Sequence, residues 1–164
     1  KQLTNLNSLL DELLNLSYHG MRAKDGSFNI DLVTHYDESL PSLTIIPQDI
    51  SRVFVNLFNN SFYATTKRVS VTDDSFKPSI RVSTKIEGGF AVVEVEDNGI
   101  GIPTDIKSNI FNPFFTTKAP NEGTGLGLSI TYEIIVDGHG GSISFNSEEG
   151  HGTCFIIKLP LGTN

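Results

Sequence analysis

A short polar turn with two glycines, DNGIG at residues 97–101, interrupts an alternating apolar run and constrains this chain more than any other stretch. The preceding residues, FAVVEVE at 90–96, alternate and are rich in β-branched side chains, which predicts a half-buried strand that ends at Asp97. Gly99 and Gly101 allow a sharp turn or a close approach of the backbone to a ligand. A carboxylate buried at this point needs donors, and the exocyclic amine of a purine is one candidate. Ordinary turn chemistry explains the same residues equally well.

The size and charge of the chain limit its partners. Its 164 residues suit one domain, and its 38% apolar and 19% charged residues are typical of a globular protein with a real core. The net charge of −7 argues against a nucleic acid or an anionic membrane as the main partner, so any phosphate binding has to be local. No apolar run is long enough to cross a bilayer. We expect a cytoplasmic domain taken from a larger protein, whose own membrane attachment is left open.

Apolar periodicity predicts the elements of the first half of the chain. Leucines at helical spacing predict a packing helix over residues 3–16, followed by His19 as a cap or surface residue. Shorter apolar runs predict strands within residues 28–37 and 43–46, and Pro47 is expected to open a second helix that reaches about residue 67.

The second helix carries an unusual set of asparagines. Asn56 and Asn60 are four residues apart, so their amides project from one helix face. Amide oxygens suit a hard cation such as Mg²⁺. The same pair could instead tie neighbouring backbone in place.

The second half of the chain predicts a hairpin, a loop and a phosphate-binding turn. Alternating runs at residues 79–87 and 90–96 flank two glycines, which is a hairpin signature. After a short helix at 105–110, residues 111–123 are too rich in proline and turn residues for regular structure, and we expect phenylalanines to pin the base of this loop. GTGLGLSI at 123–130 then opens a helix whose free N–H groups favour an anion, although such a loop could also be only a flexible joint.

These pieces stand in a fixed order: an asparagine-rich helix, DNGIG, FFTTK in a loop, and GTGLGL before a helix. Together they resemble the catalytic and ATP-binding domain of sensor histidine kinases, within the GHKL superfamily of ATPases and kinases. The resemblance covers residues 3–160. It implies the Bergerat ATP-binding fold, an α/β two-layer sandwich in which a mixed, mainly antiparallel sheet carries helices on one face.

The resemblance also assigns roles around ATP and Mg²⁺. Asp97 would accept from the adenine amine, with Gly99 and Gly101 letting the base approach, and Thr153 would support the carboxylate. Asn60 would coordinate Mg²⁺. Asn56 falls where hydrolysing relatives carry a glutamate, and because an amide cannot act as a general base, the nucleotide would be kept for transfer rather than hydrolysis. The remaining nucleotide contacts would come from Lys118 in the lid and from the phosphate loop, at Gly123, Thr124, Gly125, Leu126 and Gly127.

Two departures from the family pattern stand out. Many relatives have a lysine three residues after the magnesium asparagine, but this position is Tyr63 here, so that Lys118 or Lys67 is expected to substitute. The family's acceptor histidine lies on a separate dimerisation helix in an acidic, arginine-containing context. The four histidines of this chain, His19, His35, His139 and His151, lack that context.

Residues 1–164 are therefore interpreted as the catalytic domain of a larger sensor kinase, without its dimerisation and phosphoacceptor domain. The implied activity is transfer of the γ-phosphoryl group of Mg-ATP to a histidine on the adjoining domain, with a response-regulator receiver as the downstream partner. We expect the isolated chain to be monomeric and the parent protein to be a homodimer. Two alternatives remain open: a non-catalytic nucleotide-binding module that switches a protein interaction, and a serine-directed kinase of the same superfamily.

Overall fold

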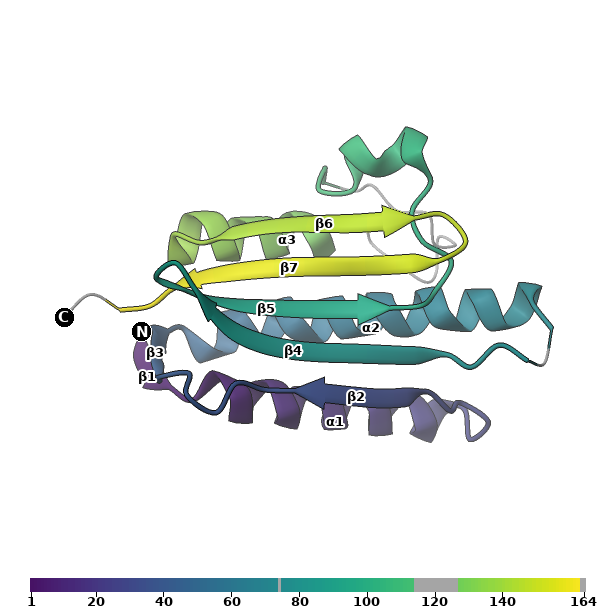
Figure 1. The fold of residues 1–164 in the computed structure, drawn as a ribbon, viewed down its shortest axis with the longest axis horizontal. Helices are drawn as coiled ribbons and strands as arrows, with labels where there is room; N and C mark the ends of the chain where they lie inside the picture. Colours follow the sequence, from purple (N-terminus) through teal and green to yellow (C-terminus); the bar gives the residue numbers. More distant parts are fainter. Residues whose placement is uncertain (74, 114–126, 163–164) are drawn as a thin grey trace.

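The fold is a two-layer sandwich, seen in a computed structural model that describes residues 1–73, 75–113 and 127–162 (Figure 1). The five-stranded sheet has the order β2-β4-β5-β7-β6, and a separate pair is formed by β1 and β3. β2 runs parallel to β4, whereas the other neighbours in the sheet are antiparallel. The helices pack on one face of the sheet, as expected. The strands are β1 (Gln2–Thr4), β2 (Asp31–His35), β3 (Leu43–Ile45), β4 (Ser79–Glu87), β5 (Phe90–Asp97), β6 (Ser142–Glu148) and β7 (Gly152–Pro160).

Two long helices lie behind the sheet in Figure 1, α1 (Leu6–Lys24) and α2 (Pro47–Val71). The short helix α3 (Gly127–Tyr132) continues into a π-helical segment, η2 (Glu133–Gly138), behind β6 and β7. The helix expected at 105–110 is a 3₁₀ segment, η1 (Thr104–Asn109).

The core lies between α2 and the sheet. Phe54, Phe58 and Phe62 of α2 have no exposed surface, and they lie on one side of the helix because they are spaced by four residues. The inward residues of β4, β5 and β7 alternate along each strand and are equally buried, including Val82, Val93 and Ile157. The loop-pinning prediction is confirmed for Phe111, whose ring lies 5.9 Å from those of both Tyr132 and Phe145.

The helix expected at residues 3–16 begins later and runs further than its leucines indicate. Asn5 caps α1, because its Oδ1 accepts from the backbone N–H of Ser8 at 3.0 Å, and the residues before it pair with β3. Leu3 is therefore a strand residue and 72% exposed. His19 lies inside α1, since the helix continues to Lys24.

The face of the sheet away from the helices is polar. Lys85 bonds Glu87 at 3.3 Å and Glu94 at 3.7 Å, and Lys158 bonds Glu87 at 3.7 Å. These pairs are half exposed, so each contributes little to stability. Within the described ranges, no helix has the length and apolar character needed to span a membrane.

We predict that Phe58→Ala lowers the free energy of unfolding by about 3–5 kcal/mol, because a fully buried ring leaves a cavity that the sheet cannot fill. Urea unfolding followed by circular dichroism measures this change. Leu16→Ala on the exposed side of α1 is the matched control and should shift stability by less than about 0.5 kcal/mol. Equal losses in the two variants would contradict this account of the core.

Candidate functional site: a buried carboxylate beside α2

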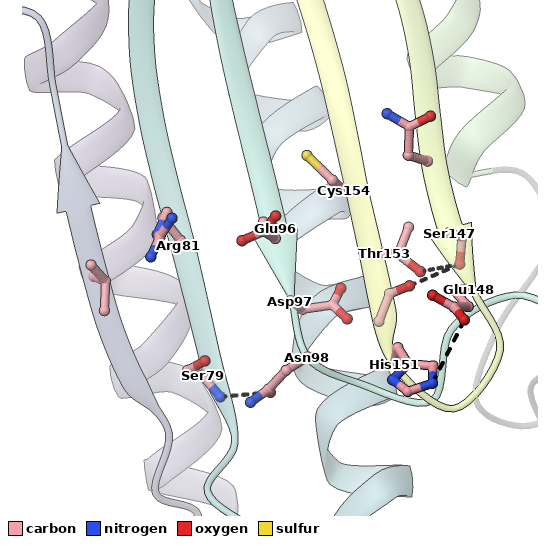
Figure 2. A pocket seen from close by; sticks show the side chains of 13 residues that line it. Ser79, Arg81, Glu96, Asp97, Asn98, Ser147, Glu148, His151, Thr153 and Cys154 are labelled. Atoms are coloured by element: carbon pink, nitrogen blue, oxygen red, sulfur yellow. Dashed lines mark hydrogen bonds and ion pairs between the residues drawn. The ribbon is translucent and has the colours of Figure 1, made fainter.

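Asp97 is the last residue of β5 and belongs to the inward set of side chains, so it faces α2 rather than solvent. Its register partners are Ile80 on β4 and Thr153 on β7. The side chain, which is labelled in Figure 2, is 6% exposed, and its Oδ1 accepts a hydrogen bond of 2.8 Å from the backbone N–H of Gly99.

Burial raises the pKa of Asp97 to about 6. The N–H of Gly99, the hydroxyl of Ser61 and the backbone of Thr153 lower the pKa but do not offset desolvation, while the charge of Glu96 raises it further. Among the described residues, no Lys, Arg or His forms an ion pair with this carboxylate. An acceptor is thus held in a dry position without a cation, which is costly unless a ligand supplies donors.

Ser61 lies on α2 against this carboxylate and is 1% exposed. Its Oγ is close enough to Asp97 to lower the pKa, yet it makes no hydrogen bond of acceptable geometry in the described part of the chain. Buried hydroxyls normally form hydrogen bonds, and a ligand that binds at this position would supply a partner for Ser61.

The two glycines of the turn at 97–101 let the turn pack closely against α2 and the end of β6. A Cβ on Gly99 would lie 2.6 Å from the backbone of Ala64, and the N–H of Ile100 donates to Ala64 O at 3.2 Å, so the turn lies directly on α2. Gly101 has a φ of +73°, and a Cβ there would lie 2.2 Å from Glu148 O. Gly99 and Gly101 therefore allow close packing of protein backbone, whatever they contribute to ligand access.

Thr153 lies beside Asp97, but its hydroxyl is directed to β6. Thr153 Oγ1 lies 2.8 Å from Ser147 Oγ, which also accepts from the N–H of Ile102 at 2.8 Å (Figure 2). Thr153 supports the carboxylate through its backbone instead. Ser147 in turn is the junction that joins the turn at 97–101 to β6 and β7.

The predicted asparagine pair lies on the side of α2 that meets α3. Asn56 donates from Nδ2 to Thr131 Oγ1 at 3.3 Å, and a Cβ on Gly127 would lie 2.3 Å from Asn56 Oδ1. Asn56 therefore ties α2 to α3 through a side-chain hydrogen bond, and its role toward a nucleotide stays a prediction. Asn60 is half-buried one turn further along, next to Ser61.

The predicted cations and the phosphate loop are described only in part. Lys67 Nζ lies 5.3 Å from the centroid of the Tyr63 ring, so its charge is directed toward the position where relatives carry a lysine. The remaining predicted residues, Lys118, Gly123, Thr124, Gly125 and Leu126, fall outside the described residues.

A separate surface depression lies on the opposite face of the sheet (Figure 2). Its lining includes Arg81, Glu96 and Cys154, which alternate with the inward residues of β4, β5 and β7. The thiol of Cys154 is half-buried rather than a core residue, and burial raises its pKa to about 11, which keeps it protonated. Asp97, Ser147 and Thr153 also line this depression, which therefore reaches the start of the turn at 97–101.

Sequence reasoning missed several residues that build the site. Ser61 and Ser147 carry no signal in the sequence, because their importance comes from neighbours far along the chain. The sequence pattern indicated only that Asn98 lies in a turn. In the structure its side chain accepts from Ser79 N and donates to Lys77 O, both at 2.9 Å, and so anchors the turn to β4. An Asn directly after a strand-ending Asp is the one local feature that could have indicated this bond.

The five-stranded mixed sheet with helices on one face defines a domain of the α/β sandwich type. Residues 45–163 match the family model described as histidine kinase-, DNA gyrase B-, and HSP90-like ATPase. The chain belongs to this ATPase family.

Its relatives include full-length sensor kinases. The chain is 32% identical to the sensory histidine kinase/phosphatase NtrB of Azospirillum brasilense, over 96% of this chain and 38% of that protein. It is 33% identical to the sensor histidine kinase ZraS of Escherichia coli K12, over 98% of this chain and 31% of that protein. The chain thus spans about a third of the length of these relatives. Among solved structures, a nucleotide-free form of the catalytic domain of histidine kinase ThkA matches with a TM-score of 0.77 and 33% identity, over 97% of this chain and 96% of that one.

We predict that Asp97→Asn stabilises the ligand-free chain at neutral and alkaline pH. The pKa of the folded carboxyl, about 6, lies above its ordinary value of 3.8, so folding favours the protonated form. That contribution is complete below pH 3.8 and is lost as the pH rises through 6. At pH 8 the free energy of unfolding of the variant should exceed that of the native chain by roughly 2 kcal/mol, since asparagine carries no charge and still accepts from Gly99.

Urea unfolding at pH 8 and at pH 4 measures the difference, which should nearly vanish at the lower pH. Asp31→Asn, at an exposed position on the edge strand β2, is the control and should show no such dependence. A difference between Asp97→Asn and the native chain that stays the same at both pH values would count against a buried, ionised Asp97.

Proposed function

We propose that residues 1–164 are the catalytic and ATP-binding domain of a sensor histidine kinase, which binds Mg-ATP and supplies its γ-phosphoryl group to a histidine on an adjoining dimerisation and phosphoacceptor domain. The observation that carries this proposal is the position of Asp97. A carboxylate 6% exposed, with a raised pKa and no ion pair to any described residue, fits an exocyclic amine donor better than it fits a structural role.

The surrounding residues fit the adenine end of a nucleotide. Ser61 adds a buried hydroxyl beside this carboxylate, and the N–H of Gly99 fixes one oxygen of Asp97 in place. Adenine offers a donor and an acceptor on adjacent ring positions. A carboxylate and a hydroxyl are complementary to that pair.

The amide of Asn60 would hold Mg²⁺ through its oxygen, on the same side of α2 as Asn56. A bound Mg²⁺ would neutralise phosphate charge during transfer. Asn56 has no basic group, so it cannot deprotonate a water molecule, and its bond to Thr131 keeps the amide at the junction of α2 and α3. This arrangement favours keeping the nucleotide for phosphoryl transfer over hydrolysing it.

One histidine of the chain, His139, is unsuited to be the acceptor. His139 is 7% exposed; its Nε2 accepts from Ile46 N at 3.0 Å and its Nδ1 lies 2.8 Å from Ile134 O. Both ring nitrogens are therefore occupied in the core, and the ring is neutral with the proton on Nδ1. A structural histidine of this kind cannot serve as a phosphoacceptor without opening the fold.

The proposal includes the context of the domain. The acceptor domain would be part of the same, longer protein, which would be a homodimer, and a response-regulator receiver would take the phosphoryl group from it. We place the domain in the cytoplasm, where ATP and such a receiver are available, and expect residues 1–164 alone to be monomeric.

We predict that Asp97→Asn weakens ADP binding by about 10- to 100-fold, since a charge-assisted hydrogen bond is lost. Calorimetric titration with ADP and Mg²⁺ measures the change, and the expected gain in stability of the same variant separates lost binding from lost folding. Asn60→Ala should reduce Mg²⁺-dependent affinity while leaving binding without Mg²⁺ nearly unchanged. An unchanged ADP affinity in Asp97→Asn would remove the basis of the adenine assignment.

Phosphoryl transfer is tested by mixing the chain with a separately expressed dimerisation domain and radiolabelled ATP. Acid-labile phosphate on a histidine of the added domain is the expected product. Acid-stable phosphate would indicate a serine-directed kinase, and nucleotide binding without transfer would favour a non-catalytic switch. Label on His19 of the chain itself would contradict a separate acceptor.

A further inference from the structure

The guanidinium of Arg68 joins two segments that are far apart in the sequence. Arg68 lies near the end of α2, and its Nη1 donates to Asn98 O at 2.8 Å and to His151 O at 3.3 Å. Asn98 follows Asp97 directly, and His151 lies in the β6–β7 turn, two residues before Thr153. Both acceptors are thus main-chain carbonyls of segments that carry predicted base-binding residues.

The position of Arg68 is itself fixed. Its guanidinium carbon lies 4.4 Å from the centroid of the Phe76 ring, in the connection between α2 and β4. This stacking limits the orientations of the planar guanidinium and leaves its edge for the carbonyls. The arginine forms no ion pair within the described ranges, so its donors serve the backbone rather than a carboxylate.

Other bonds hold the same two segments, but none replaces this one. The amide of Asn98 ties the turn at 97–101 to the start of β4, and Gly150 N donates to Ile100 O at 2.6 Å. Arg68 differs from these bonds because a single side chain contacts both Asn98, the residue next to Asp97, and the β6–β7 turn. Because Gly99 and Gly101 have no side chains that could anchor the turn, a contact from outside the turn helps to hold the direction of the carboxylate.

We propose that Arg68 is a positioning residue for base recognition: its guanidinium fixes the carbonyl of Asn98 against the β6–β7 turn and thereby sets the orientation of the Asp97 carboxylate toward the purine amine. This inference rests on the proposed nucleotide binding and adds a residue that touches no nucleotide itself. Arg68 acts through the main chain, so its effect on affinity depends on Asp97 being present.

A double-mutant cycle with ADP tests this dependence. Calorimetric titrations would compare the native chain, Arg68→Met, Asp97→Asn and the double variant; methionine keeps an apolar chain against Phe76 and removes the donors. Arg68→Met should weaken ADP binding by about 10-fold in the native background, the loss expected for a charge-assisted hydrogen bond. In the Asp97→Asn background the same substitution should change the affinity by no more than about 2-fold.

Two further variants separate positioning from general destabilisation. Arg68→Lys keeps the charge and one donor that reaches Asn98 O, so its affinity should lie between those of the native chain and Arg68→Met. Arg81→Met removes an arginine from the opposite face of the sheet, where none of the described residues pairs with it, and should leave ADP binding unchanged. Thermal unfolding of each variant shows whether the chain is folded at the temperature of the titration.

Each outcome decides the question. Equal losses from Arg68→Met in both backgrounds, or no loss in the native background, would overturn the positioning role while leaving the proposed function intact. Failure of the native chain itself to bind ADP would overturn both. If Arg68→Met does not fold, the same cycle run with Arg68→Lys decides between coupled and additive effects.

Discussion

Burial of the apolar side of α2 on the sheet is the constraint on which the rest of this structure depends. Phe54, Phe58 and Phe62 are completely buried, so the rotation of the helix about its axis is fixed. That rotation puts Ser61 against Asp97 and Ala64 against the turn at 97–101, and it turns Asn56 toward α3. The packing that stabilises the fold therefore also builds one wall of the site.

The Asp97 carboxylate at the end of β5 lowers the stability of the fold at neutral pH. An apolar or amide side chain at position 97 would be easier to bury at neutral pH, because Asp97 loses hydration and forms no ion pair with the part of the chain that the structure describes. The fold tolerates the charge because the N–H of Gly99 and the backbone of Thr153 point to it. Local instability at a ligand site that is otherwise held firmly is typical of binding and catalytic centres.

Around this point the chain uses main-chain and hydroxyl contacts more than ion pairs. Ser147 gathers Ile102, Gly152 and Thr153, while Asn98 and Arg68 bind carbonyl and N–H groups of neighbouring turns. The ion pairs of the sheet lie on its other face, among Lys85, Lys158 and their glutamates. Directional bonds of this kind hold the turn at 97–101 to three elements at once, which is what a flexible, glycine-containing segment requires.

The sequence by itself determined the β4–β5 hairpin, the helix that carries Asn56 and Asn60, and the strand end at Asp97, because these follow from local periodicity and turn chemistry. The sandwich was implied by the resemblance of the motifs to histidine kinase catalytic domains. The sequence pattern misplaced the start of α1, since residues 2–4 pair with β3 about 40 positions further along the chain, and it missed the local cap between Asn5 and Ser8. Only the tertiary structure decided that Gly99 lies on α2, that the Thr153 hydroxyl bonds Ser147, and that Ser61, Asn98 and Arg68 lie around Asp97 and its turn. The physical reason is that burial and hydrogen bonding depend on which distant segments meet, and a pattern read along one strand or helix contains no information about its neighbours.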